Sequence, residues 1–292
     1  MLDIQYASDL HIEDWPQDTS FYKFITPIAP ILVVAGDICS AWDPLYKQFL
    51  SWASHNWYIV IVVAGNHEYH CHKHPHTVFE TDMYIFNMCQ NHSNVKFLQA
   101  GTTYCIPGTN IRFVGATLWS NVNPDIYEHV SSKKSDYKKC WVAPSMVRCG
   151  QGAPFKMLHP TDTTMYHMWH CYNLEQSIWP HSDKEILIVV THYMPTLELL
   201  EDEYKEDLIK SCYASNDEWL IQPNITAWIC GHGHRATMWR SSTGVPVYMN
   251  ARGYNRENEL KRQKDKYNPM AVLKVTLAQS VPHPHALLVP RT

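Results

Sequence analysis

The chain has 292 residues, of which 45% are hydrophobic and 18% are charged. A chain of this size can bury a large core, so we expect a single domain over residues 1–292. The formal net charge of −4 argues against the broad basic surface that binds long nucleic acids. No apolar run approaches the ~18 residues of a membrane-spanning helix, so no membrane partner is expected.

The cysteine pattern and the two ends of the sequence bear on the compartment. The nine cysteines are scattered and include no C-x-x-C pair. An odd, scattered set predicts reduced thiols and a cytoplasmic location. The first residues lack the basic and apolar regions of a secretory signal, so none is expected. Near the other end, Leu288-Val289-Pro290-Arg291 matches a protease-cleavage linker, and both an added linker and a natural tail remain open.

The first third of the sequence predicts alternating strands and helices. Apolar runs predict buried strands over residues 1–7, 31–35 and 59–63. A helix is predicted to open at Asp43-Pro44, since Asp is a good N-cap and Pro suits the first turn. The apolar face expected for this helix consists of Leu45, Phe49, Trp52 and Ala53. A second helix is predicted over residues 77–90, with the inward-facing candidates Phe79, Met83, Phe86 and Met88.

The remainder of the chain starts with short strands and then changes character. Residues 95–98 predict a strand, and residues 103–107 and 111–118 predict a hairpin. Residues 121–160 are polar and lack a periodic pattern, which suggests a lid-like excursion over one face. A helix is predicted over residues 161–179, with Met165, Met168, Trp169, Tyr172 and Ile178 as expected core contacts. The later strands are predicted over residues 186–190, 227–230, 246–250 and 271–277.

Five of the predicted strands are followed by side chains that bind metals or move protons. In chain order these are Asp9-x-His11, Gly36-Asp37, Gly65-Asn66-His67-Glu68, His192 and Gly231-His232-Gly233-His234. Ligands of α/β sheets gather beyond the carboxyl ends of the strands. We therefore expect these five strand exits to meet at one site.

This ordered set resembles the pattern of the calcineurin-like metallophosphoesterases, which is D-x-H, G-D, G-N-H-[DE], a lone H and G-H-x-H. No single block is specific, but all five occur here in order. The resemblance covers most of the chain and is weakest between about residues 121 and 184. It implies an α/β fold, a four-layer α/β/β/α sandwich, and hydrolysis of phosphoester bonds at a dinuclear metal centre.

The resemblance also implies a ligand set. One metal would be held by Asp9, His11, Asp37 and His234. The second would be held by Asp37, Asn66, His192 and His232, with Asp37 as the bridge. Such oxygen and nitrogen donors suit divalent Mn, Fe, Zn or Ni, of which we favour manganese. Two such ions would lower the pKa of a shared water from ~15.7 towards ~7, and the bridging hydroxide would attack phosphorus.

Further roles follow from the same resemblance. His67 is expected beside the metals, where it would protonate the leaving oxygen or hydrogen bond a phosphoryl oxygen. Glu68 is expected to orient His67. Arg252, Arg235 and Tyr193 are candidates for substrate contact, although a structural role for each remains open.

The sequence departs from several branches of this family. Gly36-Asp37 continues into Ile38-Cys39-Ser40, unlike the phosphoprotein phosphatases, and both Asp9 and His67 are retained. We therefore expect an enzyme that hydrolyses a small phosphodiester or nucleotide. A DNA or RNA nuclease is the alternative enzyme, although nucleic acid is not favoured. A non-catalytic binding module on the same fold is the alternative from another class, and the oligomeric state stays open.

Overall fold

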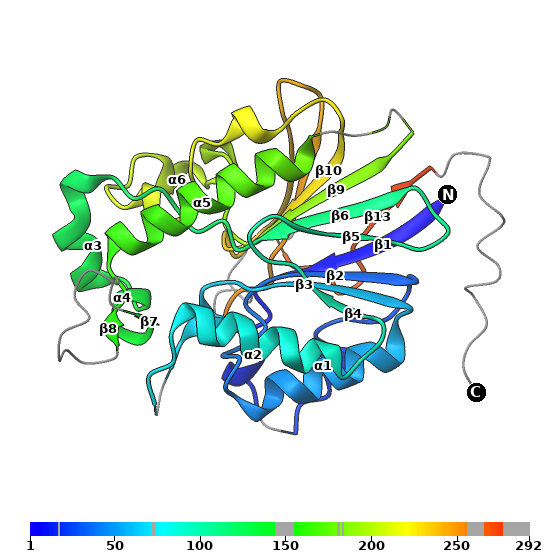
Figure 1. The fold of residues 1–292 in the computed structure, drawn as a ribbon, viewed down its shortest axis with the longest axis horizontal. Helices are drawn as coiled ribbons and strands as arrows, with labels where there is room; N and C mark the ends of the chain where they lie inside the picture. Colours follow the sequence, from blue (N-terminus) through cyan, green and yellow to red (C-terminus); the bar gives the residue numbers. More distant parts are fainter. Residues whose placement is uncertain are drawn as a thin grey trace.

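The computed structural model describes residues 1–16, 18–71, 74–143, 155–179, 182, 184–255 and 266–276. Two sheets lie face to face in the middle of the molecule (Figure 1). The first has the order β13-β1-β2-β3-β4, in which β13 is antiparallel to β1 and the others are parallel. Its strands are β1 (Leu2–Ala7), β2 (Ile31–Ala35), β3 (Ile59–Val63), β4 (Val95–Phe97) and β13 (Val272–Val275).

The second sheet has the order β11-β12-β10-β9-β6-β5. Its four inner strands are parallel and its two edge strands are antiparallel to their neighbours. Its strands are β5 (Thr102–Cys105), β6 (Ile111–Ala116), β9 (Ile186–Thr191), β10 (Ile225–Cys230), β11 (Ala236–Arg240) and β12 (Pro246–Asn250). The predicted hairpin is the antiparallel pair of β5 and β6.

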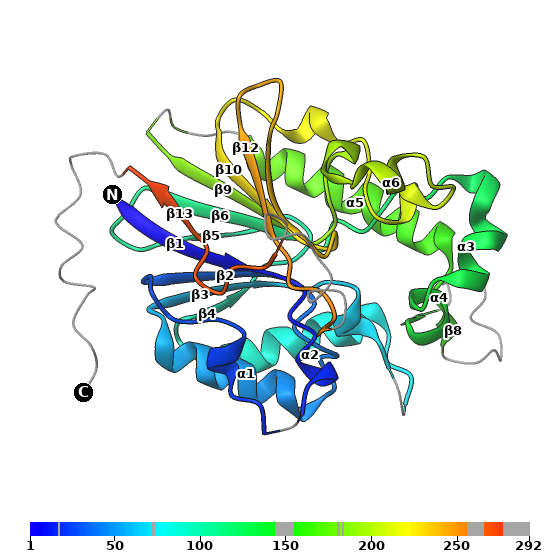
Figure 2. The ribbon, with the colours of Figure 1, turned by 180° about the vertical axis from the view of Figure 1, so that it is seen from behind.

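Helices cover the outer faces of both sheets (Figures 1 and 2). The first sheet is covered by α1 (Pro44–Asn56) and α2 (Val78–Gln90), and the second by α5 (Pro160–Ile178). The shorter elements are α3 (Tyr127–Lys133), α4 (Asp136–Lys139), α6 (Asp202–Lys205), β7 (Trp141–Val142) and β8 (Lys156–Met157). None of the helices in the described ranges is long and apolar enough to cross a membrane.

The alternation of side chains along each central strand creates the four layers. In β2, Ile31, Val33 and Ala35 belong to the core between the two sheets. Leu32 and Val34, which point the other way, belong to the core beneath the helices. A strand buried on both faces is apolar throughout, which explains the uninterrupted apolar runs in the sequence. The predicted four-layer α/β/β/α sandwich is therefore confirmed.

The helix starts agree with the sequence, but the inward faces predicted for α2 and α5 are wrong. Asp43 caps α1 by accepting from the Leu45 amide, and Thr77 and Glu80 form a capping box at α2. In α2 the core-facing side is formed by Val78, Thr81, Ile85, Met88 and Cys89. The predicted inward residues Phe79, Met83 and Phe86 are instead exposed, and only Met88 is buried.

The prediction for α5 fails in the same way. Of its expected core contacts only Ile178 is buried, whereas Met165, Met168, Trp169 and Tyr172 are exposed. The buried side of α5 carries polar residues, among them Thr163, His167 and His170. Hydrogen bonds satisfy these groups, as when the Leu118 amide donates to His170 Nδ1 at 3.1 Å. A prediction based on hydrophobicity alone therefore placed the wrong side of α5 against the core.

The polar excursion over residues 121–160 contains α3, α4, β7 and β8, while residues 144–154 lie outside the described ranges. These elements lie at the end of the molecule opposite the N-terminus (Figure 1). They are tied to the first sheet's helical layer, because Trp141 pairs with Thr77 at the start of α2. The lid role of this excursion stays a prediction.

Candidate metal centre and active site

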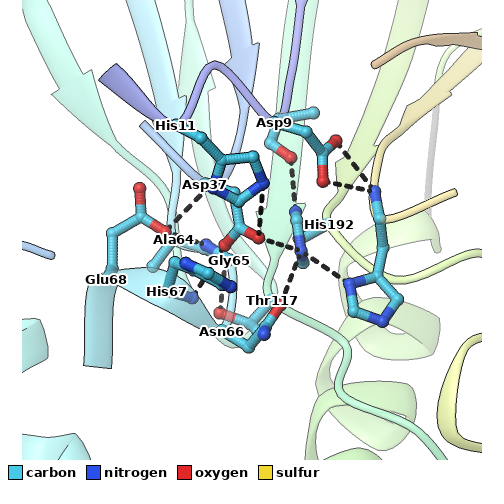
Figure 3. A network of polar contacts seen from close by, with 12 residues as sticks. Asp9, His11, Asp37, Ala64, Gly65, Asn66, His67, Glu68, Thr117 and His192 are labelled. Carbon is cyan, nitrogen blue, oxygen red and sulfur yellow. Dashed lines mark hydrogen bonds and ion pairs between the residues drawn. The ribbon is translucent and has the colours of Figure 1, made fainter. Parts of the chain in front are cut away.

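The loops after β1, β2, β3, β9 and β10 bring the predicted ligands to one place (Figure 3). Five of these ligands have left-handed backbone conformations, a rare state outside glycine: Asp9, His11, Asp37, His232 and His234. Each such residue costs about 1–3 kcal/mol, and this strain collects at functional sites. The folded protein therefore imposes these conformations in order to aim the side chains.

Glycine is required where these loops come closest together. Gly36 has a φ of 85°, and a Cβ at this position would lie 2.5 Å from His192 Nδ1. A Cβ on Gly65 would overlap the carboxylate of Asp37. Both glycines thus allow the exits of β2, β3 and β9 to pack against one another.

One group of donors surrounds His11. Its Nε2 lies 3.2 Å from Nε2 of His234 and 3.9 Å from Oδ2 of Asp37. His234 Nε2 in turn lies 3.5 Å from Oδ1 of Asp9. The four side chains expected to hold the first metal therefore converge.

A second group of donors surrounds His192. Its Nε2 lies 3.0 Å from Oδ1 of Asn66, 3.2 Å from Nδ1 of His232 and 3.4 Å from Oδ2 of Asp37. Asp37 is the residue common to the two groups, and its Oδ2 faces both His11 and His192 (Figure 3). This is the place that a bridging carboxylate requires.

The hydrogen bonds behind the second group favour a cation in front of it. The Ala35 carbonyl can only accept, so His192 Nδ1 carries a proton and donates it to this carbonyl at 2.8 Å. In the neutral ring, Nε2 then carries the lone pair that can bind a metal. The Asn66 amide group donates through Nδ2 to Asp136, which leaves its oxygen facing His192. Lone pairs that converge in this way, each fixed by a partner behind it, fit a divalent ion.

The charges in the site are strongly coupled. Burial opposes ionisation of Asp37, yet the imidazoles of His192 and His67 hold the pKa of Asp37 well below its usual range. Burial likewise works against the charged form of His192, but Asp37 raises the pKa of His192 to about 10. Since metal-binding histidines must be neutral, binding of cations here releases protons.

Glu68 makes contacts different from those expected. Its carboxylate accepts from the backbone amides of Gly65, Asp37 and Ile38 at 2.7, 2.9 and 2.8 Å. These contacts hold the exit of β2 against the exit of β3. Figure 3 shows the Glu68 carboxylate at one side of the site, against the backbone of these loops. The expectation that Glu68 orients the ring of His67 is corrected accordingly, because its oxygens are used by backbone donors.

Glu13 and Tyr254 flank His67, and Glu13 is a residue that the sequence reasoning missed. Glu13, in the turn after β1, places Oε1 3.5 Å from His67 Nδ1, and the hydroxyl of Tyr254 lies 3.0 Å from Nε2. Burial would lower the pKa of His67, but Asp37 and Glu13 raise it to about 9. The side chain of His67 is 14% exposed, so its protonated ring reaches the surface of the site. The Glu at position 13, two residues after the D-x-H block, was the available signal.

Asp136 is a further residue that the sequence did not reveal. It lies in α4, within the polar excursion, and is buried. Its Oδ1 accepts from Asn66 Nδ2 and from His70 Nε2, both at 2.8 Å. Because an amide group can flip, this bond decides which atom of Asn66 faces the metal site.

Loss of the hydrogen bond between Asn66 and Asp136 should weaken metal binding by the second donor group. In Asp136→Ala we expect an activity and an affinity for the second metal ion that are about 10–100-fold lower, the usual effect of an outer partner. Steady-state kinetics across a metal titration measure both. Asp125→Ala is the control, since Asp125 is exposed in the same excursion. Unchanged metal affinity in Asp136→Ala would contradict the positioning role.

The three candidate substrate contacts lie around the site in different settings. Tyr193 is 2% exposed, and its ring packs 4.2 Å from the ring of His232. The guanidinium of Arg252 stacks on Trp15 at 4.0 Å and is buried. Arg235 is half-buried beside His234. Substrate contact by Tyr193, Arg252 and Arg235 stays a prediction.

The sequence model for calcineurin-like phosphoesterases matches residues 4–236, which include every residue of the two donor groups. The chain belongs to the calcineurin-like phosphoesterase family. It is a phosphoester hydrolase of a family that depends on dinuclear metal centres.

Similar proteins cover nearly the same length. Uncharacterized protein L509 of Acanthamoeba polyphaga mimivirus is 23% identical, over 93% of this chain and 96% of its own. The crystal structure of the phosphopantetheinyl hydrolase PptH from Mycobacterium tuberculosis matches 89% of this chain and 93% of its own, with a TM-score of 0.63 and 16% identity. At this identity the likeness concerns the fold.

Proposed function

We propose that this phosphoesterase hydrolyses a small phosphodiester or nucleotide with two divalent ions, manganese being favoured. The observation that carries the proposal is the position of Asp37 between two sets of donors, with Oδ2 3.9 Å from His11 Nε2 and 3.4 Å from His192 Nε2. The donors are oxygen and nitrogen atoms only, which suits Mn, Fe, Zn or Ni. The eight cysteines of the described ranges are free thiols, which supports a cytoplasmic location.

Each of the two donor groups supplies the proposed ligands of one metal ion. Asp9, His11, Asp37 and His234 would hold one ion, and Asp37, Asn66, His192 and His232 the other. When bound, such ions supply an activated water and neutralise charge on the phosphoryl oxygens. The chain's own part is to fix the donors through Ala35, Asp136 and Glu68, so that little reorganisation is needed.

His67 is proposed as the proton donor to the leaving oxygen. Glu13 faces Nδ1 and favours a proton there, while Asp37 favours the positively charged ring. The proton would leave from Nε2, which faces the hydroxyl of Tyr254 at 3.0 Å. The departing alkoxide would take up this proton as the P–O bond breaks, which is general acid catalysis.

A small substrate is favoured over long nucleic acid by the charges near the site. The net charge is −4, and two basic residues of the excursion, Lys134 and Lys156, already have local partners. Lys134 lies over the ring of Tyr213 at 4.1 Å, and Lys156 pairs with Asp162 at 2.8 Å. Nucleic acid binding requires several cations free to meet phosphates.

A substrate panel tests the proposal directly. The manganese-loaded full chain should be assayed with bis-p-nitrophenyl phosphate, p-nitrophenyl phosphate, cyclic nucleotides, a phosphopantetheinyl diester and single-stranded DNA. We expect at least one small ester to give a higher kcat/KM than DNA. If DNA exceeded every small ester by about 10²-fold, or about 2.7 kcal/mol of transition-state stabilisation, the nuclease would replace this proposal.

A further inference from the structure

A second group of metal-ligand side chains lies away from the candidate active site. His167 and Cys171 are one turn apart on α5, and Asp217 precedes the short turn Glu218–Leu220. Their exposed fractions are 4%, 6% and 5%. One donor atom from each of the three lies within 4.8 Å of the others. The proposed hydrolysis uses none of these residues.

The proton on His167 can be placed from its hydrogen bond. The Leu118 carbonyl can only accept, so the atom that donates to it, at 3.2 Å, is Nδ1. In the neutral ring Nε2 then carries a lone pair. Nε2 faces Cys171 Sγ at 3.4 Å and Asp217 Oδ1 at 3.4 Å. A backbone carbonyl behind the far ring nitrogen is the arrangement typical of a metal-binding histidine.

The distances favour a metal site over a close ion pair. A charge-assisted hydrogen bond from an imidazolium to a carboxylate spans about 2.7–2.9 Å, which is shorter than the 3.4 Å between His167 and Asp217. Around tetrahedral zinc, bonds of about 2.0–2.1 Å to nitrogen and about 2.3 Å to sulfur place these two ligand atoms about 3.6 Å apart. The same geometry places nitrogen and oxygen about 3.3 Å apart. Both observed separations fit this geometry.

The environment of the group also calls for a cation. Oδ2 of Asp217 is fully buried and has no hydrogen-bond partner in the described part of the chain. A buried carboxylate oxygen without a partner is costly. Burial and the neighbouring Asp217 raise the pKa of the Cys171 thiol, so the thiol keeps its proton until a cation displaces it. A divalent ion would offset the cost of the carboxylate and displace the thiol proton to solvent.

We propose that His167, Cys171 and Asp217 hold a third divalent ion, of the zinc type, that fastens α5 to the loop before β10. A thiolate beside an imidazole and a carboxylate selects zinc, whereas the active-site donors include no sulfur. Water would complete the tetrahedral coordination. Because all three side chains are buried and take no part in the proposed hydrolysis, the ion would serve to hold α5 to this loop, and through Leu118 it would also hold the loop after β6.

Cobalt substitution tests this site separately from the dinuclear centre. The full chain is stripped with a chelator and reloaded with Co²⁺, and the near-ultraviolet thiolate-to-cobalt charge-transfer band is recorded. The active-site donors have no sulfur, so they cannot produce this band. We expect the band in the wild type and in Cys89→Ser, whose cysteine is also buried, on α2. We expect its complete loss in Cys171→Ser, together with one equivalent of bound metal.

Other outcomes would overturn the proposal. The wild type could show no thiolate band, or the band could persist in Cys171→Ser. Loss of the band in Cys140→Ser alone would assign it to the group of His70, Asp136 and Cys140. If Cys171→Ser does not fold, Asp217→Asn keeps the shape and removes the charge. Zinc should raise the Tm of Asp217→Asn less than it raises the Tm of Cys89→Ser, and equal shifts would contradict the site.

Discussion

The Asp37→Asn variant should lose bound metal and activity together, with kcat/KM at least 10²-fold below that of the wild type. Loss of a residue that only orients a metal ligand lowers metal affinity or activity by about 10–100-fold. Asp37 faces both donor groups directly, so its loss should have a larger effect. Two cations close together repel, and a shared carboxylate screens that repulsion. An amide of the same shape supplies no charge, so both ions should bind more weakly.

Elemental analysis and activity on the same samples measure this effect. Asp43→Asn is the matched control, because Asp43 caps α1 and Asn is an equally good N-cap. The control should keep both ions and full activity. Two tightly bound metals per molecule of Asp37→Asn would rule out the bridging role.

The His67→Ala variant should keep its metals and lose turnover. His67 belongs to neither of the two proposed ligand sets, and its ring lies between Glu13 and Tyr254. The expected fall in kcat is about 10²–10⁴-fold, the usual contribution of general acid–base catalysis. His55→Ala, at an exposed position of α1, is the control and should behave as the wild type does.

The leaving group tells whether His67 donates a proton. Alkyl and ribose esters need protonation as the bond breaks, so their rates should fall most in His67→Ala. The p-nitrophenyl esters leave without much protonation and should lose less. Equal losses for all leaving groups would favour a hydrogen bond to the phosphoryl oxygens instead. Unchanged rates with every ester would make His67 a structural residue.

The strands, the polar residues that follow them and the family could be predicted, because they depend on residues that are adjacent in the sequence. A strand buried on both faces must be apolar throughout, so the central strands stood out at residues 31–35, 59–63 and 186–190. The polar residue that follows each strand is fixed in sequence position, and the parallel topology brings these exits together.

The inward face of α5 could not be predicted from hydrophobicity, because the protein interior accepts polar side chains wherever it offers them hydrogen-bond partners. On α5 the sequence suggested that Trp169 and Tyr172 face inward, yet His167 and His170 are buried and hydrogen bonded to the backbone of Leu118. Burial of a polar group depends on a partner that is distant in the chain. Hydrophobic periodicity contains no information about that partner.

The sequence by itself determined the two-sheet fold and the family, and it predicted the donor residues, since each rests on short motifs at strand ends. Only the tertiary structure decided what surrounds those donors. Glu68 holds backbone amides, Glu13 faces His67, and Asp136 reaches Asn66 across 70 residues of sequence. The group of His167, Cys171 and Asp217, which we propose as a metal site, likewise joins Asp217 to α5. Such partners are selected by distance in space, and a lone Asp or Glu in a loop has no local pattern that distinguishes it from a solvated one.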